Sequence, residues 1–365
     1  MAKSTDGGIA FGNATILSRN SSLPKEPQIA ATGSNVYVAW YDNITGNYEP
    51  FLVVSTDNGT NFSNPINLSQ KAGVSNKYAA DEYGLLASFS QIAATGNELY
   101  VIWYNNVTGT IQTFLTKSTD NGSTFSDPIN LSQKAKVGSS ISLAVSQNNV
   151  YVLWTPREDE SNKTTATDTP FARKLILLVK STDGGTTFSQ PVIVTNEYGF
   201  GWIKVVVANN NNLYVAWRHD TVEPGSAEGI MRVLSSGISL SKSIDGGTTF
   251  GQPINIIESE NYIGGDFNIA ATANNVYAVW SMDTSRDILS MESIFVAKSK
   301  DGGTTFNKLP IDVSKGRFPV VSVSDDNNNL YIAWLDNIGN AEIFFTKIKG
   351  NLPQLPKITG KGSIG

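Results

Sequence analysis

A strand of alternating side chains recurs six times along the sequence, and each copy ends on a tryptophan. In the first copy, Val36, Val38 and Trp40 point to one face of the strand, whereas Tyr37 and Ala39 point to the other. Both faces are largely apolar, which is typical of a strand packed between two neighbouring sheets. The six strands end at Trp40, Trp103, Trp154, Trp217, Trp280 and Trp334.

A second pattern, S-x-D-x-G-x-x-F, also occurs six times, and we refer to it as the octapeptide motif. Its glycine permits a positive φ, its aspartate can accept hydrogen bonds from turn amides, and its phenylalanine can fill the gap between sheets. We therefore expect structural roles for the motif aspartates. These are Asp6, Asp57, Asp120, Asp183, Asp245 and Asp301.

Each repeat contains four short strands separated by turn residues, with the octapeptide motif between the third and the fourth. Six such repeats predict an all-β fold, a six-bladed β-propeller of four-stranded antiparallel blades. The predicted blades span 20–69, 85–132, 139–195, 202–257, 266–314 and 317–348, within one domain from 1 to 350. Because the last repeat lacks a fourth strand, we expect residues 14–18 to close the ring as its outer strand. Residues 351–365 have the composition of a linker-like tail.

Composition and charge exclude several classes of protein. The chain is 40% hydrophobic and 16% charged, as in a folded domain, and its net charge of -5 gives no reason to expect a nucleic-acid partner. It has no cysteine and a single histidine, which excludes disulfides and cysteine-based zinc sites or nucleophiles. No apolar run is long enough for a transmembrane segment. The start MAKSTDGG matches the end of a repeat strand, so we expect a leader, and an anchor where one exists, to lie outside this chain.

The first half of the chain is crowded with N-x-S/T sequons, the acceptor sequence for N-glycosylation. They lie at Asn13, Asn20, Asn43, Asn58, Asn61, Asn67, Asn106, Asn121, Asn130 and Asn162. A glycoprotein outside the cell or at the cell surface would explain them. The alternative is chance, because the sequence is rich in Asn, Ser and Thr.

The octapeptide motifs, such as Ser181–Phe188, resemble the Asp boxes (BNR repeats) of the sialidase superfamily, and they extend over essentially the whole chain. For an active sialidase, the resemblance implies three arginines that clamp the substrate carboxylate, a tyrosine nucleophile and an aspartate acid/base. Asp boxes also occur in proteins that hydrolyse nothing. The resemblance therefore points to the fold more specifically than to a reaction.

Loops at the end of each blade opposite to the octapeptide motif are where we expect a site. Candidate ligand-binding residues there are Arg157, Arg218, Arg286, Arg317 and Trp202, and candidate catalytic residues are Asp220, Tyr262, Tyr198 and Asp266. The Phe/Tyr-Arg-Ile-Pro sequence of sialidases is absent from the first blade, where Lys25 precedes Glu26-Pro27. The nearest match to that sequence is Gly316–Pro319 in the last blade. The tendency of the first strand of a repeat to carry proline also explains this match.

Two functions are therefore open. We favour a noncatalytic binding or interaction module for glycans or surface partners, because the arginine sequence is missing. The alternative is a secreted exo-sialidase or related glycoside hydrolase. Such an enzyme would be a retaining hydrolase that uses a tyrosine nucleophile and binds the substrate carboxylate with arginines. We expect no cofactor or metal, since the acidic turn at 325–327 lacks the spacing of a calcium-binding EF-hand and is explained as a hairpin turn.

Overall fold

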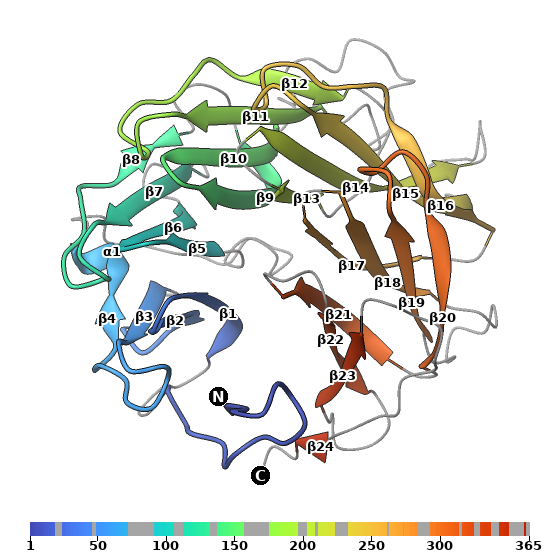
Figure 1. The fold of residues 1–365 in the computed structure, drawn as a ribbon. Coiled ribbons are helices and arrows are strands. Elements are labelled where there is room, and N and C mark those ends of the chain that lie inside the picture. Colours follow the sequence, from blue (N-terminus) through green and yellow to red (C-terminus); the bar gives the residue numbers. More distant parts are fainter. Residues whose placement is uncertain are drawn as a thin grey trace. The chain divides into compact units, whose positions relative to one another are not determined.

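The computed structural model describes the strands and most of the short turns of the chain. The described residues are 1–18, 24–45, 49–71, 91–105, 112–131, 137–156, 175–195, 203–208, 211–222, 233–260, 263–272, 274–282, 293–313, 316–324, 329–336, 343–349 and 361–362. They contain six four-stranded antiparallel sheets, in each of which the strands follow one another in chain order (Figure 1). These six blades confirm the predicted all-β, six-bladed β-propeller.

Blades one to three are built from the first twelve strands. Blade one contains β1 (Lys25–Thr32), β2 (Asn35–Asp42), β3 (Glu49–Ser55) and β4 (Ile66–Asn67), followed by a single helical turn, α1 (Leu68–Lys71). Blade two contains β5 (Gln91–Thr95), β6 (Glu98–Asn105), β7 (Gln112–Ser118) and β8 (Ile129–Asn130). Blade three contains β9 (Val137–Ser146), β10 (Asn149–Pro156), β11 (Ile176–Ser181) and β12 (Val192–Thr195).

Blades four to six are built from the second twelve strands. Blade four contains β13 (Ile203–Ala208), β14 (Asn212–Val222), β15 (Val233–Ser243) and β16 (Ile254–Ser259). Blade five contains β17 (Ile263–Ala271), β18 (Val276–Met282), β19 (Ser293–Ser299) and β20 (Asn307–Val313). Blade six contains β21 (Gly316–Val323), β22 (Asn329–Asp336), β23 (Ile343–Lys349) and β24 (Lys361–Gly362).

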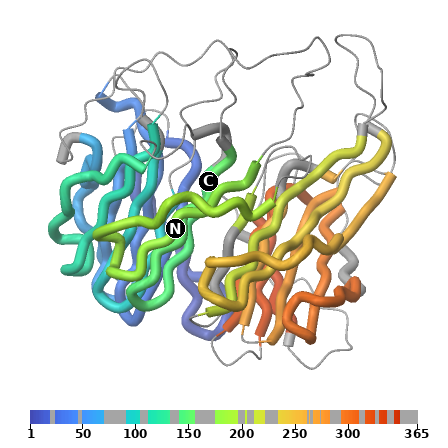
Figure 2. The backbone as a smooth tube through the Cα atoms, turned by 90° about the horizontal axis from the view of Figure 1, so that it is seen from above, coloured from blue at the N-terminus to red at the C-terminus, as the bar shows by residue number. Residues whose placement is uncertain are grey.

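The chain divides into two compact units, and Figure 2 shows their strands from a second direction. The first unit contains Met1, Thr15–Thr167 and Leu175–Ile193, and therefore blade one, blade two and blade three up to Ile193. The second contains Ala2–Ala14, Asp168–Lys174 and Val194–Gly365, and with them blades four to six.

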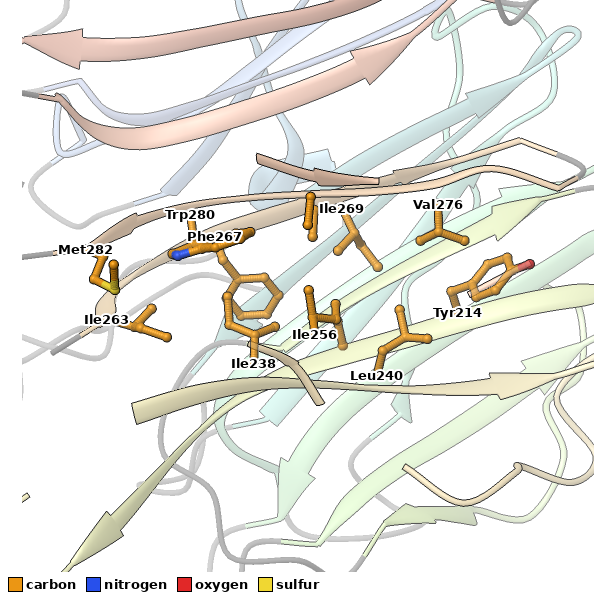
Figure 3. Close-up of a cluster of buried hydrophobic side chains, with 13 residues drawn as sticks. Tyr214, Ile238, Leu240, Ile256, Ile263, Phe267, Ile269, Val276, Trp280 and Met282 are labelled. Atoms are coloured by element: carbon orange, nitrogen blue, oxygen red, sulfur yellow. The ribbon is translucent and has the colours of Figure 1, made fainter. Parts of the chain in front are cut away.

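Within each unit, neighbouring blades pack face to face through the alternating side chains of their strands. In the first unit, Tyr37 and Ala39 of β2 share a core cluster with Val101 and Trp103 of β6. In the second unit, Ile238 and Leu240 of β15 pack against Phe267 and Trp280 of blade five (Figure 3). The alternation read from the sequence thus becomes burial on both faces of a strand.

The octapeptide motif folds into the same turn in each copy, and Ser181–Phe188 is typical. The Ser181 hydroxyl donates to Asp183 Oδ1 at 2.6 Å, and the same oxygen accepts the backbone N–H groups of Thr186 at 3.0 Å and Thr187 at 2.9 Å. The fourth residue of the motif is in the left-handed region, with φ of 65° at Gly184. These contacts occupy the aspartate within its own turn.

The hydrogen bonds within the turn also lower the pKa of the motif aspartates. At Asp183 the largest causes are hydrogen bonds from the hydroxyls of Ser181 and Thr187. At Asp120 a hydrogen bond from the Thr124 hydroxyl is the largest cause, and the pKa falls to about 2. The turn therefore stabilises the charged form of each carboxylate.

The outer strand of blade six is β24, which pairs with Ile343 and Phe344 of β23. The sequence leads us to expect residues 14–18 in this place, and the structure differs because the N-terminal segment folds back on itself. Thr15 N–H donates to Met1 O at 2.8 Å, and Gly12 N–H donates to Lys3 O at 2.9 Å. Residues 12–15 thus lie beside residues 1–3.

Among the described residues, no helix is long and apolar enough to span a membrane.

Candidate functional site

A cluster of charged and hydroxyl side chains lies at the end of blade four opposite to its octapeptide motif, where β14 continues beyond Trp217 to Val222. Strand pairing places His219 beside Gly237 and Gly237 beside Glu258, so one row crosses three strands. The next row places Asp220 beside Ser236. We name these residues together the blade-four site, which has two halves: Arg218, Asp220 and Ser236 lie on one face of the sheet, and His219, Ser235, Gly237, Ser239 and Glu258 lie on the other.

An ion pair between Arg218 and Asp220 forms one half of the blade-four site. Arg218 Nη2 lies 2.8 Å from Asp220 Oδ1 and 2.6 Å from Oδ2, and the Ser236 hydroxyl donates to Oδ1 at 2.6 Å. The two side chains are only 7% and 6% exposed. At this burial the pair is held by charge-assisted hydrogen bonds with little screening by water. The structure thus brings together two of the residues singled out in the sequence.

The other half of the blade-four site is a contact between His219 and Glu258. His219 Nε2 lies 2.7 Å from Glu258 Oε2, and the Ser235 hydroxyl donates to Oε1 of the same carboxylate. His219 Nδ1 lies 3.1 Å from the Ser239 hydroxyl, which in turn donates to Asn255 Oδ1 at 2.9 Å.

Gly237 creates the space in which His219 and Glu258 meet. A Cβ added at this glycine would lie 2.3 Å from two atoms of the His219 ring and 2.5 Å from Glu258 Oε2. Such distances are shorter than any van der Waals contact. A side chain at residue 237 would therefore force the pair apart.

Blade four departs from most of the other blades at two positions of its third strand. Stacked tryptophan–phenylalanine pairs cross the second and third strands of four blades, as Trp40 and Phe51 do, whereas Trp217 faces Ser239. Two residues earlier, blade one has the buried Glu49, and blade four has Gly237. The sequence alone did not indicate Ser235, Ser236, Gly237, Ser239 or Glu258 as site residues. An alignment of the six repeats would have marked Gly237 and Ser239 as exceptions.

The remaining candidate residues are distributed as follows. Arg317 is half-buried in β21, where the pairing register shifts before Val320 and Phe318 has a φ of 54°. Lys25 precedes the same irregularity in β1, since Glu26 has a φ of 52°. The backbone of Asp266 belongs to β17, and its side chain is outside the described part of the structure. Arg157, Arg286, Trp202, Tyr198 and Tyr262 lie outside the described residues, as does the acidic turn at 325–327.

The sequons differ in how their asparagine side chains are used. Asn13 and Asn58 are exposed. Three others donate through Nδ2 to a neighbouring side chain, as Asn67 does to Glu49 at 2.7 Å; these three are Asn61, Asn67 and Asn130. Asn43 and Asn121 are half-buried, and Asn20, Asn106 and Asn162 lie outside the described residues.

Within the described part of the chain, no group of three or more His, Asp or Glu side chains is arranged to hold a metal ion.

Comparisons with known proteins give structural likeness without a sequence family. No protein-family model matches the chain, and no curated protein sequence matches it. The α-L-arabinofuranosidase Arb93A from Fusarium graminearum matches with a TM-score of 0.55 and 11% identity, over 89% of this chain and 93% of that one. The polysaccharide lyase Uly1 matches with a TM-score of 0.52 and 12% identity, over 88% of this chain and 77% of that one.

Sialidases are also among the structural neighbours. The Hadza microbial sialidase Hz136 has a TM-score of 0.49 and 15% identity over 88% of this chain, and the Trypanosoma rangeli sialidase has a TM-score of 0.49 and 13% identity over 90%. The present chain spans only 65% and 54% of these two proteins. At these identities the likeness to known structures concerns the fold alone.

Proposed function

We propose that this chain is a noncatalytic β-propeller that binds glycans at the blade-four site and works outside the cell or at its surface. The ion pair between Arg218 and Asp220 carries the proposal. A sialidase-type mechanism needs arginines that face the carboxylate of the substrate. Arg218 instead directs Nη2 at both carboxylate oxygens of Asp220, and the pair is almost fully buried.

The same ion pair argues against Asp220 as a catalytic acid. Glycoside hydrolysis of the usual kind requires one carboxylic acid that gives a proton to the leaving group. Asp220 accepts hydrogen bonds from Arg218 and Ser236 on Oδ1, and it is the anionic member of a salt bridge. These contacts favour a structural or ligand-positioning role.

Two parts of the proposal, that the ligand is a glycan and that the chain works outside the cell, rest on indirect support. By their names, the arabinofuranosidase and the polysaccharide lyase that share the fold act on carbohydrates. The exposed sequons at Asn13 and Asn58 fit a secreted or surface protein. We further propose that the chain is a divergent member of the Asp-box propellers, because all six octapeptide motifs form the same turn.

Two assays on the purified chain test this proposal together. Fluorogenic α-sialosides, α-L-arabinofuranosides and β-xylosides should show no turnover above buffer, whereas a glycan array should show saturable binding. Turnover that disappears in Asp220→Asn and persists in Asp127→Asn, a change at an exposed aspartate of blade two, would instead support the glycoside hydrolase alternative. Absence of binding to every glycan would reject the proposal.

A further inference from the structure

The part of the blade-four site that faces solvent is formed mainly by Glu258. Its side chain is 39% exposed, compared with 15% for His219. Arg218 and Asp220 are only 7% and 6% exposed and neutralise each other. A ligand on the His219 face of blade four therefore meets the Glu258 carboxylate, whereas the Arg218 guanidinium is buried on the opposite face of the sheet.

We infer that the blade-four site selects neutral, hydroxyl-rich sugars over sugars that carry a carboxylate. This inference rests on the glycan binding proposed above and specifies the class of sugar that is bound. A carboxylate on the ligand would lie close to the Glu258 carboxylate, and like charges at contact distance disfavour binding. Arg218 cannot offset this repulsion, because its charge is already paired with Asp220.

The hydrogen-bonding capacity of Glu258 matches the hydroxyls of a sugar. A carboxylate has about four acceptor positions. Ser235 occupies one on Oε1, and His219 occupies one on Oε2. Among the described residues no other group donates to Glu258, so one acceptor position on each oxygen is left for a ligand, and these contacts orient the carboxylate. Two neighbouring hydroxyl groups of a pyranose or furanose ring can donate to such a pair.

The corresponding position of blade one shows how this exposed acid arises. In blade one the acid is Glu49 on the third strand, which is 4% exposed and accepts from Asn67 and Ser69 at 2.7 and 2.8 Å. In blade four Gly237 takes that position, and the acid is on the outer strand, as Glu258. The carboxylate that stabilises the interior of blade one is thus replaced by one that faces solvent.

Direct binding measurements with two sets of probes test this inference. The neutral set consists of arabinan, xylan and galactan oligosaccharides, and the acidic set of sialyllactose and oligogalacturonates. We expect the neutral set to contain the best ligand, with acidic sugars at least tenfold weaker. Glu258→Gln should weaken neutral binding about tenfold and should reduce the discrimination against acidic sugars, because it removes the charge and keeps the shape.

Gly237→Ala provides an independent variant, since its Cβ would displace both His219 and Glu258. Gly251→Ala is the matched control in the same blade, because its Cβ would meet only the Lys242 backbone oxygen at an ordinary 3.5 Å. Neutral binding should be lost in the first and retained in the second. Thermal unfolding of all three variants shows whether each is folded.

The possible outcomes separate this inference from the proposal on which it rests. Neutral binding that depends on Glu258 and Gly237 supports both. Binding of acidic sugars alone, or neutral binding that is unchanged in folded Glu258→Gln, overturns the inference and leaves glycan binding intact. No binding to either set overturns both.

Discussion

Single aspartates in the octapeptide motifs illustrate how a charged side chain can serve the fold alone. Asp120 accepts the Thr124 hydroxyl at 2.6 Å, the Thr124 backbone N–H at 2.8 Å and the Ser118 hydroxyl at 2.7 Å. These hydrogen bonds stabilise the carboxylate and lower its pKa to about 2. In blade four the same turn, at Asp245, lies at the opposite end of the sheet from the blade-four site.

A lowered pKa predicts how Asp120→Asn changes stability with pH. An aspartate has a pKa of about 3.9 in the unfolded chain, so its contribution is complete above that pH. It is lost as pH falls through the folded value of about 2. We expect the variant to melt below the parent at pH 7 and the difference to shrink steadily between about pH 4 and pH 2.

Melting curves across this pH range check the prediction, with Asp127→Asn as the control at an exposed position that follows the same motif. A difference between Asp120→Asn and the parent that stays constant down to pH 2 would show that the charge of Asp120 is not the source of its stabilising effect.

The Arg218–Asp220 pair predicts a larger effect of a single side chain. Asp220→Ala would leave the Arg218 guanidinium buried without its carboxylate, which typically costs about 3–5 kcal/mol. Urea unfolding should therefore show a marked loss for Asp220→Ala and less than about 1 kcal/mol for Asp127→Ala at an exposed position. Equal losses would mean that water reaches Arg218 and replaces its partner.

At the scale of elements, the blades depend on packing between their faces. Trp280 of β18 stacks on Phe295 of β19 with ring centroids 5.9 Å apart, and the other face of the sheet packs on blade six through Tyr277 and Val279. Each central strand is thus buried on both sides. This double burial explains why the second strand of every repeat is largely apolar on both faces up to its tryptophan.

Two isoleucines of blade four test the predicted contribution of this packing. Ile238 is fully buried between blades four and five, whereas Ile244 in the octapeptide motif is 70% exposed. Ile238→Ala should lower the free energy of unfolding by about 2–5 kcal/mol because it removes buried contacts and leaves a cavity. Ile244→Ala should change it by less than about 0.5 kcal/mol. Comparable effects in urea unfolding would contradict this account of the core.

The N-terminal octapeptide motif provides a second test at this scale. Gly8 has a φ of 86°, and an added Cβ would lie 2.6 Å from the Phe345 ring of β23. Gly8→Ala should therefore lower the melting temperature, through a backbone cost of about 1–2 kcal/mol and displacement of Phe345. Gly12→Ala, whose Cβ would meet only the Lys3 backbone oxygen at 3.6 Å, is the control. No change in Gly8→Ala would show that this segment does not pack on β23 in solution.

For the molecule as a whole, the six blades could be predicted from the sequence, but the outer strand of blade six could not. The strands ending at Trp40 and its five equivalents are long, apolar and regularly spaced, so local patterns determine them. The outer strand of blade six could not be predicted in this way, because β24 is only Lys361–Gly362 and carries no alternating pattern. Its pairing depends on contacts with β23 that are distant in sequence.

The blade-four site was only partly predictable for the same reason. Arg218 and Asp220 stood out as charged residues directly after a repeat strand. Their pairing with each other, and the meeting of His219 with Glu258, depend on the register of three strands over Gly237. A glycine and several serines carry no chemical signal until that register is known.

The central claim is that the chain binds a glycan without cleaving it. Isothermal titration calorimetry of the strongest array ligand into the parent protein measures binding. Mass spectrometry of the sugar recovered from the calorimeter cell shows in the same experiment whether the sugar was cleaved. We predict a saturable heat of binding and an intact sugar. A continuing heat signal with shortened sugar, abolished by Asp220→Asn, would contradict the claim and identify an enzyme.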